Sequence, residues 1–531
     1  MFQFGLFFSA CLKDSVQKIK KLNGATWNGT YALPVLKTHF LPEDAIQFTD
    51  EISDVGAYKD SQVYMEYRKT AVSLKGQDIL KPPSVNAGFK YSLDAAEQNL
   101  LEGGSVVMER DQIIEWPQQG ANIDSMLFKS GKFHVQVDNS INHSLNLTVI
   151  LLGNKPGNAV SQSIQLPWSG QNNQGGFDID LSNVMADLTR GPKGYNQLRI
   201  RIRAIFTNTS GGKINGSDQL SCTFTANEFS WIRAHGRFNS RDILNHSDDL
   251  RLGALSADFT ANNTVFKDAR LKIKWSNSFG LPIDVNLNSL GFIQGDGSRK
   301  LISGTSKPYS AKPAGIEAGK PVPETDSLYL NSLNSNIANL VEDQPHYLFW
   351  NETLITRASS SPSNQTIWSE SNCSVSISLE LPLYFETKGI TITASGDLPE
   401  NWKSEASNMQ WIVFRFKIRN ELPLSLGIQA YFLDEQNNIL DSLLSPYNEL
   451  VPAASSDSLG NAIGAHEEFI DIKLERPKIV GITNARRIFM EARVSTALKQ
   501  GKPIEKCKIK QGQGLYIKLG VHSSLNVYRK F

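Results

Sequence analysis

Apolar and polar side chains alternate along residues 411–419, WIVFRFKIR, in the C-terminal part of the chain. A break at residues 420–423, NELP, follows, and then a second apolar run over residues 424–432. A polar turn, DEQNN, occupies residues 434–438. Period-2 alternation bounded by Asn, Pro and Asp is typical of paired β-strands, so this stretch predicts two strands joined by a bend.

The same pattern occurs twice more along the chain. In one copy an alternating strand over residues 133–137 breaks at Asn139, and in the next the break runs from Asn277 to Pro282. The break asparagines of the three copies, the last being Asn420, recur about every 140 residues. Self-similarity at this interval indicates tandem domains rather than a solenoid of short repeats.

These copies divide the chain into units. With 531 residues the chain is too long for a single hydrophobic core. We predict a mostly β protein with short helices, built from three successive β-sandwiches at residues 121–242, 250–395 and 400–531. Residues 12–120 contain further alternating stretches, and we assign them to an N-terminal β-rich region.

Two of the three copies carry a helix-start signal after the strand pair. Ser182–Asn183 and Ser335–Asn336 precede apolar residues at helical spacing, which predicts a short N-capped helix in each. The third copy has Pro477 at this place, which predicts only a turn. An insertion rich in Pro, Gly, Ser and Lys at residues 303–326 of the second copy predicts an exposed loop.

Each unit closes with a strand pair that begins at a cysteine, namely Cys222, Cys373 or Cys507. Their similar distances from the break asparagines predict equivalent positions in the three units. A free cysteine behaves as a small hydrophobe, so we expect one buried, unpaired thiol in each core. A disulfide between two of them would require neighbouring cores within about 7 Å, Cα to Cα.

The stretches RNELPLSLGIQAYFLDEQNNILDS and SNSFGLPIDVNL resemble β-sandwiches of the late-embryogenesis-abundant, water-stress type. Together with WNGTYALPVL and GLYIKLGVHSSLNVY, nearly the full length also resembles a group of β-rich lipoproteins. These belong to the outer membrane of gliding, polysaccharide-degrading Gram-negative bacteria. The resemblance implies tandem sandwiches, immunoglobulin-like or late-embryogenesis-abundant-like, and a cell-envelope location. It brings no activity with it.

The N-terminus adds a candidate modification site. Residues 1–10, MFQFGLFFSA, are apolar and end in small residues directly before Cys11, which resembles the lipobox of bacterial lipoproteins. In that family the cysteine becomes the lipidated first residue of the mature chain. The resemblance therefore predicts a lipoprotein signal at residues 1–11, lipidation of Cys11, and a polar tether at residues 13–21. The alternative is that residues 1–10 form a short strand of the first domain.

Charge and motifs give no support for nucleic-acid binding or catalysis. Lys plus Arg (54) balance Asp plus Glu (53), whereas nucleic-acid proteins show a basic surplus or stripe. None of the eight histidines stands in an HExxH pair, and the chain has no GxSxG elbow. Residues 434–438 lack the glycine of a calcium-binding EF-hand loop, which favours a hairpin turn. We expect no catalytic centre, no metal and no cofactor.

Two tryptophans are the remaining candidates for a ligand contact. Trp168 lies in QLPWSGQNNQGG and Trp368 in SNQTIWSESN, both polar and loop-like. An exposed indole surrounded by amide side chains could stack on a sugar ring. The alternative is a tryptophan that packs over a sandwich end.

Two functions of different classes follow from these patterns. The first is a non-enzymatic, lipid-anchored envelope protein that acts as an interaction or scaffold module, with an envelope protein or a glycan as its partner. The alternative is a surface glycan-binding lipoprotein that assists polysaccharide uptake. Both place the chain at the outer membrane, on the cell surface or on the periplasmic face. We expect binding through sandwich-end loops, at residues 167–176 and 303–326.

Overall fold

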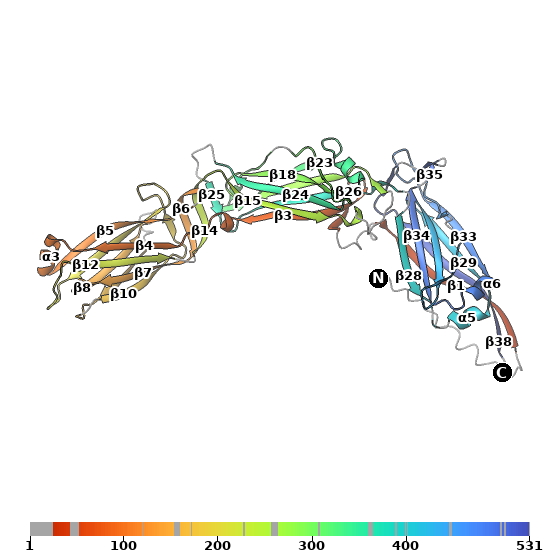
Figure 1. Cartoon of the computed structure of the whole chain (residues 1–531), viewed down its shortest axis with the longest axis horizontal. Helices are drawn as coiled ribbons and strands as arrows, with labels where there is room; N and C mark the ends of the chain where they lie inside the picture. The colour runs from red at the N-terminus through yellow and green to blue at the C-terminus, as the bar shows by residue number, and fades with distance from the viewer. Residues whose placement is uncertain are drawn as a thin grey trace.

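The computed structural model shows an elongated, bent row of three β-rich bodies, which we call the first, second and third sandwich (Figure 1). Strands make up 60% of the structure and helices 8%, which confirms the mostly β prediction. The structure describes residues 25–42, 52–118, 120–152, 160–170, 173–226, 229–255, 264–305, 308–358, 365–387, 390–398, 400, 402–444, 449–496, 498–499, 502–503 and 506–529.

The first sandwich contains two four-stranded antiparallel sheets. Their apolar side chains meet in a core to which Phe133 and Leu147, both fully buried, contribute from opposite sheets. One sheet has the order β10 (Asn173–Asp180), β7 (Lys132–Asn139), β13 (Leu220–Ala226), β4 (Val85–Tyr91). The other has the order β5 (Ser105–Glu115), β12 (Gln197–Thr207), β8 (Ser144–Leu151), β9 (Val160–Leu166).

The second sandwich repeats this arrangement with small additions at the sheet edges. One sheet has the order β2 (Asp54–Ala57), β3 (Val63–Lys75), β26 (Asn372–Pro382), β17 (Arg270–Asn277), β23 (Glu324–Leu330). The other has the order β15 (Arg241–Arg251), β24 (Tyr347–Thr356), β18 (Ile283–Ile293), β19 (Arg299–Leu301), with β20 (Tyr309–Ala311) also on β18.

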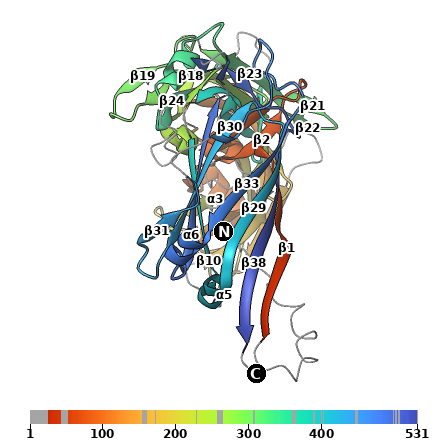
Figure 2. The same cartoon turned by 90° about the vertical axis from the view of Figure 1, so that its right-hand side faces the viewer.

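The third sandwich has the same strand order again. One sheet has the order β1 (Ala25–Phe40), β38 (Leu515–Arg529), β29 (Met409–Asn420), β33 (His466–Glu475). The other has the order β28 (Ile390–Asp397), β34 (Arg487–Thr496), β30 (Leu424–Leu433), β31 (Ile439–Ser442), with β32 (Glu449–Val451) also on β30. β1 and β38 form a long ribbon that extends beyond the other strands (Figure 2).

Two small sheets join the sandwiches, and each takes one strand from the following sandwich. The first junction sheet has the order β11 (Met185–Asp187), β6 (Ala121–Ser130), β14 (Ser230–Phe238), β25 (Gln365–Trp368). The second has the order β16 (Thr264–Phe266), β27 (Tyr384–Thr387), β37 (Cys507–Lys508). Two isolated hairpins complete the strands: β21 (Gly315–Glu317) with β22 (Lys320–Val322), and β35 (Leu498–Lys499) with β36 (Lys502–Pro503).

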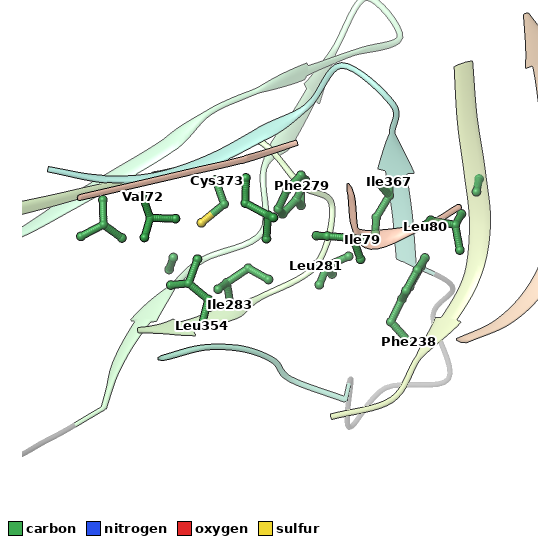
Figure 3. Packing of buried hydrophobic residues seen from close by; sticks show 14 of the residues in the cluster. Val72, Ile79, Leu80, Phe238, Phe279, Leu281, Ile283, Leu354, Ile367 and Cys373 are labelled. Atoms are coloured by element: carbon green, nitrogen blue, oxygen red, sulfur yellow. The ribbon is translucent and has the colours of Figure 1, made fainter. Parts of the chain in front are cut away.

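The hydrophobic core passes through both junctions. One cluster of buried side chains runs from the first sandwich through the second and into the adjoining end of the third. At the first junction, Phe279 and Leu281 of the second sandwich lie with Phe238 of β14 and Ile367 of β25 (Figure 3). Each of these four side chains is at most 3% exposed. Because close-packed interiors resist deformation, such junctions stiffen the row of sandwiches.

The three break asparagines form the same hydrogen-bonded turn, which confirms that they are equivalent. Their side chains are at most 2% exposed. Each side-chain oxygen accepts the backbone N–H two residues on, namely that of Ile141 (3.2 Å), Phe279 (2.9 Å) or Leu422 (2.9 Å). Each side-chain amide donates to the carbonyl four residues on, namely that of His143 (3.3 Å), Leu281 (2.9 Å) or Leu424 (2.8 Å). An asparagine that satisfies turn backbone in this way ends the strand before it.

The N-terminal region does not build a sheet of its own in the described residues. Its strands are distributed over all three sandwiches: β1 pairs with β38 of the third, β3 with β26 of the second, and β4 with β13 of the first. Each of the three occupies the same place beside the strand that pairs with the asparagine strand. The predicted N-terminal β-rich region, residues 12–120, is therefore not a separate domain in the described structure.

The prediction of a helix or a turn after the strand pair is correct in one of the three copies. Helix α4 (Ile337–Glu342) follows Ser335–Asn336 as predicted. After Ser182 the chain instead forms a turn, with Asn183 at a φ of 60°, and enters β11. At Pro477, where only a turn was expected, α6 (Arg476–Gly481) begins, because proline suits the first turn of a helix. The other helices are α2 (Gly76–Ile79), α3 (Ala95–Glu102), α5 (Trp402–Asn408) and the 3-10 turn η2 (Gly253–Leu255).

The three cysteines are free and at most 1% exposed, as predicted. Burial raises the pKa of the Cys222 and Cys373 thiols to about 12, so they are inert at neutral pH. The prediction of equivalent positions is wrong for Cys507. Cys222 and Cys373 lie on β13 and β26, beside the asparagine strands, whereas Cys507 lies on β37 of the second junction sheet. The third counterpart of β13 and β26 is β38, which starts only at Leu515.

Candidate functional site at the free end of the first sandwich

Every sandwich has one end marked by its asparagine turn. In the second and third sandwiches this end is covered by the preceding sandwich, whose junction sheet also includes β25 or β37. In the first sandwich, the end around Asn139 carries α3 and points away from the rest of the chain (Figure 1). We call the surface formed there by residues 139–144, 167–170 and 207–219 the free end.

Trp168 lies in this free end, close to the asparagine turn. Its backbone N–H donates to Ser144 Oγ at 3.1 Å, and Asn173 Nδ2 donates to the Pro167 carbonyl at 2.8 Å. The indole is half-buried, and its Nε1 is buried without a hydrogen-bond partner among the described residues. Trp168 therefore combines a partly exposed aromatic surface with an unused donor.

The remainder of the free end is polar and held by its own hydrogen bonds. His143, 5% exposed, accepts the Thr209 backbone N–H at its Nδ1 at 3.2 Å, so the ring proton of the neutral form lies on Nε2. Burial lowers the pKa of His143, which favours this neutral form. Asn142 Nδ2 donates to the Lys213 carbonyl at 2.7 Å and ties the loop to the turn. A Cβ on Gly212 would lie 2.2 Å from the Asn142 carbonyl oxygen, so this contact needs glycine.

Trp368 does not join Trp168. It lies on β25 of the first junction sheet opposite Arg233, and its side chain is only 8% exposed. The expectation of an exposed, ligand-binding indole therefore does not hold for Trp368, which packs at the junction. The residues around β25 are polar, so the sequence predicts a loop there. The strand that pairs with it, β14, is more than a hundred residues away and leaves no local signal.

The insertion at residues 303–326 is more ordered than the predicted loop. It contains β20, and β21 and β22 form a two-residue hairpin around Ala318 and Gly319, with φ values of 49° and 76°. Two consecutive positive φ values match the mirror-image turns that suit the twist of hairpin strands. The hairpin is exposed, but Ile316 and Val322 lie on opposite faces of it, because Val322 pairs with Gly315, the residue before Ile316. They do not form one apolar patch.

Two charged clusters in the second sandwich escaped the sequence analysis. On one sheet face, Asp54, Glu66, Glu380 and Arg270 form a single cross-strand row. Arg68 and Ser378 pair with Glu66, and Tyr58 donates to Glu380 Oε2 at 2.8 Å. Burial and this hydrogen bond raise the pKa of Tyr58. Since these residues satisfy one another, the row stabilises the sheet, and sequence alone cannot bring together positions more than three hundred residues apart.

The second cluster lies where β15 meets β24. His246 Nδ1 lies 3.0 Å from Glu352 Oε1, and Glu352 is only 1% exposed. Burial raises the pKa of Glu352, although His246 opposes the shift. Glu352 Oε2 has no hydrogen-bond partner among the described residues. Within that part of the chain, Glu352 is therefore a buried carboxyl that has a partner for only one of its two oxygens.

The described residues show no metal site and no membrane-spanning helix. No group of three or more His, Cys, Asp or Glu side chains in that part of the chain is placed to hold a metal. No helix there is long and apolar enough to cross a bilayer. At residues 434–438, Asp434 Oδ1 accepts the Gln436 and Asn438 backbone N–H groups at 2.9 and 2.8 Å, which is the predicted hairpin turn. Cys11 lies outside the described residues.

No protein-family model matches the chain, and no curated protein sequence matches it. Among solved structures, it is similar to a protein of Parabacteroides distasonis described as secreted, with a TM-score of 0.27 and 12% identity over 93% of this chain and 99% of that one. It is also similar to the VP2 subviral particle of infectious bursal disease virus, with a TM-score of 0.15 and 8% identity over 85% of this chain and 82% of that one. Scores this low carry no argument about function.

Proposed function

We propose that the protein is a non-enzymatic, lipid-anchored envelope protein that acts as a scaffold or interaction module at the outer membrane. The observation that carries this proposal is the separation of two ends. Ala25, the first described residue, pairs with Arg529 at the end of the third sandwich farthest from the free end. A lipid on Cys11, only fourteen residues before Ala25 in the chain, would attach the row of sandwiches by that end.

The stiffness of the row supports the same proposal. Paired strands and a continuous core cross both junctions, so the sandwiches do not hang on flexible linkers. A stiff row attached at one end presents the opposite end at a fixed distance from the membrane. The free end, with its small polar loops and Trp168, is then the surface offered to an envelope partner.

Replacing the anchor residue tests the proposal. In the native host, a Cys11→Ser variant should move from the membrane fraction to the soluble fraction, and incorporation of labelled palmitate should be lost. Ser15→Ala, in the predicted tether, is the matched control and should stay membrane-bound. Continued membrane association of Cys11→Ser would contradict the lipid anchor.

A photo-crosslinking residue at Ser217, an exposed position of the free end, tests the interaction role. It should give one discrete cross-linked envelope component in intact cells. The same residue at Lys59, exposed in the β2–β3 turn beside the second junction, is the control. Equal cross-linking from both positions would contradict the assignment of the free end as the binding surface.

A surface glycan-binding role, assisting polysaccharide uptake, is the second candidate, and the partly exposed indole of Trp168 in the polar free end favours it. A sugar ring could stack on the exposed part of this indole. Binding to a polysaccharide panel should be lost in Trp168→Ala and only weakened in Trp168→Phe, which keeps a smaller aromatic ring for stacking. Deletion of the exposed β21–β22 hairpin, residues 315–322, should leave it unchanged. Absence of any glycan binding by the parent protein would remove this candidate.

A further inference from the structure

Three of the strands in the N-terminal region, β1, β3 and β4, run in one direction along the molecule. β1 ends at Phe40 beside Leu515, and Leu515 faces Asn420 of the third asparagine turn. β3 likewise runs toward the second asparagine turn, since Leu74 faces Cys373. Each strand therefore travels toward the asparagine end of its sandwich, which is the direction of the free end.

The first sandwich completes the series. β4 ends at Tyr91 opposite Leu220, and Leu220 faces Asn139 at the free end. The strands β1, β3 and β4 thus lead in turn through the third, second and first sandwiches to the free end, where α3 reverses the chain. Figure 1 shows these segments in red and orange in all three bodies. The remaining chain then returns through the sandwiches in the order first, second, third.

The lengths of the three strands differ in a graded way. β1 has 16 residues, β3 has 13 and β4 has 7. β1 pairs with β38 from Ala25 to Phe40, with one irregularity between Pro34 and Leu36. The longest strand pair is therefore the one nearest the N-terminal end of the described chain.

This geometry decides how a pulling force reaches the protein. Hydrogen bonds of an antiparallel ladder lie perpendicular to the strands. A force that pulls Ala25 outward while the free end is held acts along β1, so the whole β1–β38 ladder is sheared at once. A force that separates Ala25 from Arg529, its partner at the ladder's end, instead opens the ladder one pair at a time.

We propose that the strands β1, β3 and β4 form a strap that carries tension between the N-terminal attachment point and the free end. The physiological role of the strap rests on the proposed lipid anchor, but its mechanics do not. Load that shear transfers from β1 to β38 passes on to β29, which pairs with the opposite edge of β38. The junction strands β37 and β25 then connect the sandwiches in series, and β3 and β4 repeat the shear arrangement further along.

Force spectroscopy in two pulling directions tests the strap on the full-length chain carrying Cys11→Ser. In the shear geometry, one handle is at the N-terminus and the other at a ligation tag inserted after Gly216, an exposed glycine with open space around it. In the unzipping geometry the handles are at the two termini. The first rupture force should be several-fold higher in the shear geometry. Equal forces would overturn the proposal.

A removable staple identifies the strand that yields. Thr30 and Ser524 are directly opposite in the β1–β38 ladder, and facing residues of an antiparallel pair lie within disulfide range. The native thiols are buried and do not compete. In Thr30→Cys with Ser524→Cys, the first rupture should disappear in both geometries when oxidised and return on reduction. A first shear rupture that is unchanged by oxidation would mean that another element bears the load.

The outcomes separate this inference from the proposed function. A membrane-bound Cys11→Ser variant together with a strong difference between the two pulling directions would leave the strap and remove the lipid anchor. A soluble Cys11→Ser variant with equal rupture forces in the two directions would support the lipid anchor and remove the strap.

Discussion

The ends of the first and second sandwiches are built from the same local structure and have different surroundings. Asn139 and Asn277 each end a strand with the same two-residue and four-residue hydrogen bonds. At the second turn, Phe279 packs into the junction core with residues of the first sandwich. At the first turn, loops of the same sandwich cover Ile141 and leave a polar surface. The same asparagine turn therefore lies either in the contact between two sandwiches or at a free end, depending on whether another sandwich packs against it.

Replacing the two candidate tryptophans should give the largest contrast between these ends. Trp368→Ala removes a buried indole from the junction, which should lower the free energy of unfolding by about 3–5 kcal/mol. Trp168→Ala removes a half-buried one and should cost about 1–2 kcal/mol, because the polar free end admits water. Urea denaturation followed by far-ultraviolet circular dichroism measures both. A cost for Trp168→Ala equal to that of Trp368→Ala would show that the free end is packed like a junction.

The turn asparagines should show a smaller contrast of the same sign. Asn277→Ala leaves buried backbone groups unpaired, including the Phe279 N–H and the Leu281 carbonyl, and should cost about 3 kcal/mol. Asn139→Ala should cost about half of that, since water can reach the loops of the free end. Thermal and chemical denaturation of both variants provides the comparison. A reversed order would contradict the view that the second turn is the more enclosed.

Two buried carboxyls should make the first and second sandwiches respond oppositely to acid. Hydrogen bonds from Thr189 and the Arg190 guanidinium outweigh burial and hold the pKa of Asp187 below its ordinary 3.8. Its stabilisation is present above about pH 4 and is lost as the pH falls through the lowered pKa. The stability difference between the parent and Asp187→Asn should therefore shrink below that pH.

For Glu352 the sign reverses. Because burial raises the pKa of Glu352 above 4.5, the ionised form costs stability at neutral pH, and protonation relieves this cost as the pH falls. The free energy of unfolding of the parent should therefore rise relative to that of Glu352→Gln as the pH falls toward 4.5. Parallel denaturation curves at several pH values measure both pairs. Changes of the same sign in the two pairs would contradict the opposite shifts.

The smallest effect should come from the β21–β22 hairpin of the second sandwich. Ala318 adopts a left-handed φ of 49°, which costs a residue with a Cβ about 1 kcal/mol or more relative to glycine. Ala318→Gly should therefore raise the hydrogen-exchange protection of β21 and β22 several-fold without changing global unfolding. Ala314→Gly, just before β21, is the control. Lower protection in Ala318→Gly would mean that chain entropy outweighs the strain.

Local patterns in the sequence predicted much of the strand content but not the partners of each strand. Alternation gave the asparagine turns, the strands beside them and the buried thiols of Cys222 and Cys373, because each depends on neighbours a few residues away. Trp368 was misplaced for the opposite reason: the strand partner that buries it comes from another sandwich. The same holds for Cys507, whose partner Phe385 is more than a hundred residues away.

The sequence by itself determined a mostly β chain with three related units, each marked by an asparagine that satisfies its own turn. Only the tertiary structure decided that the N-terminal strands β1, β3 and β4 are shared among the three units, and that the asparagine end of the first unit remains free. The physical reason is that side-chain alternation specifies a strand and its buried face, whereas the choice of partner depends on which sheet edge is open. For Ala25 and Arg529 that partnership spans almost the whole chain.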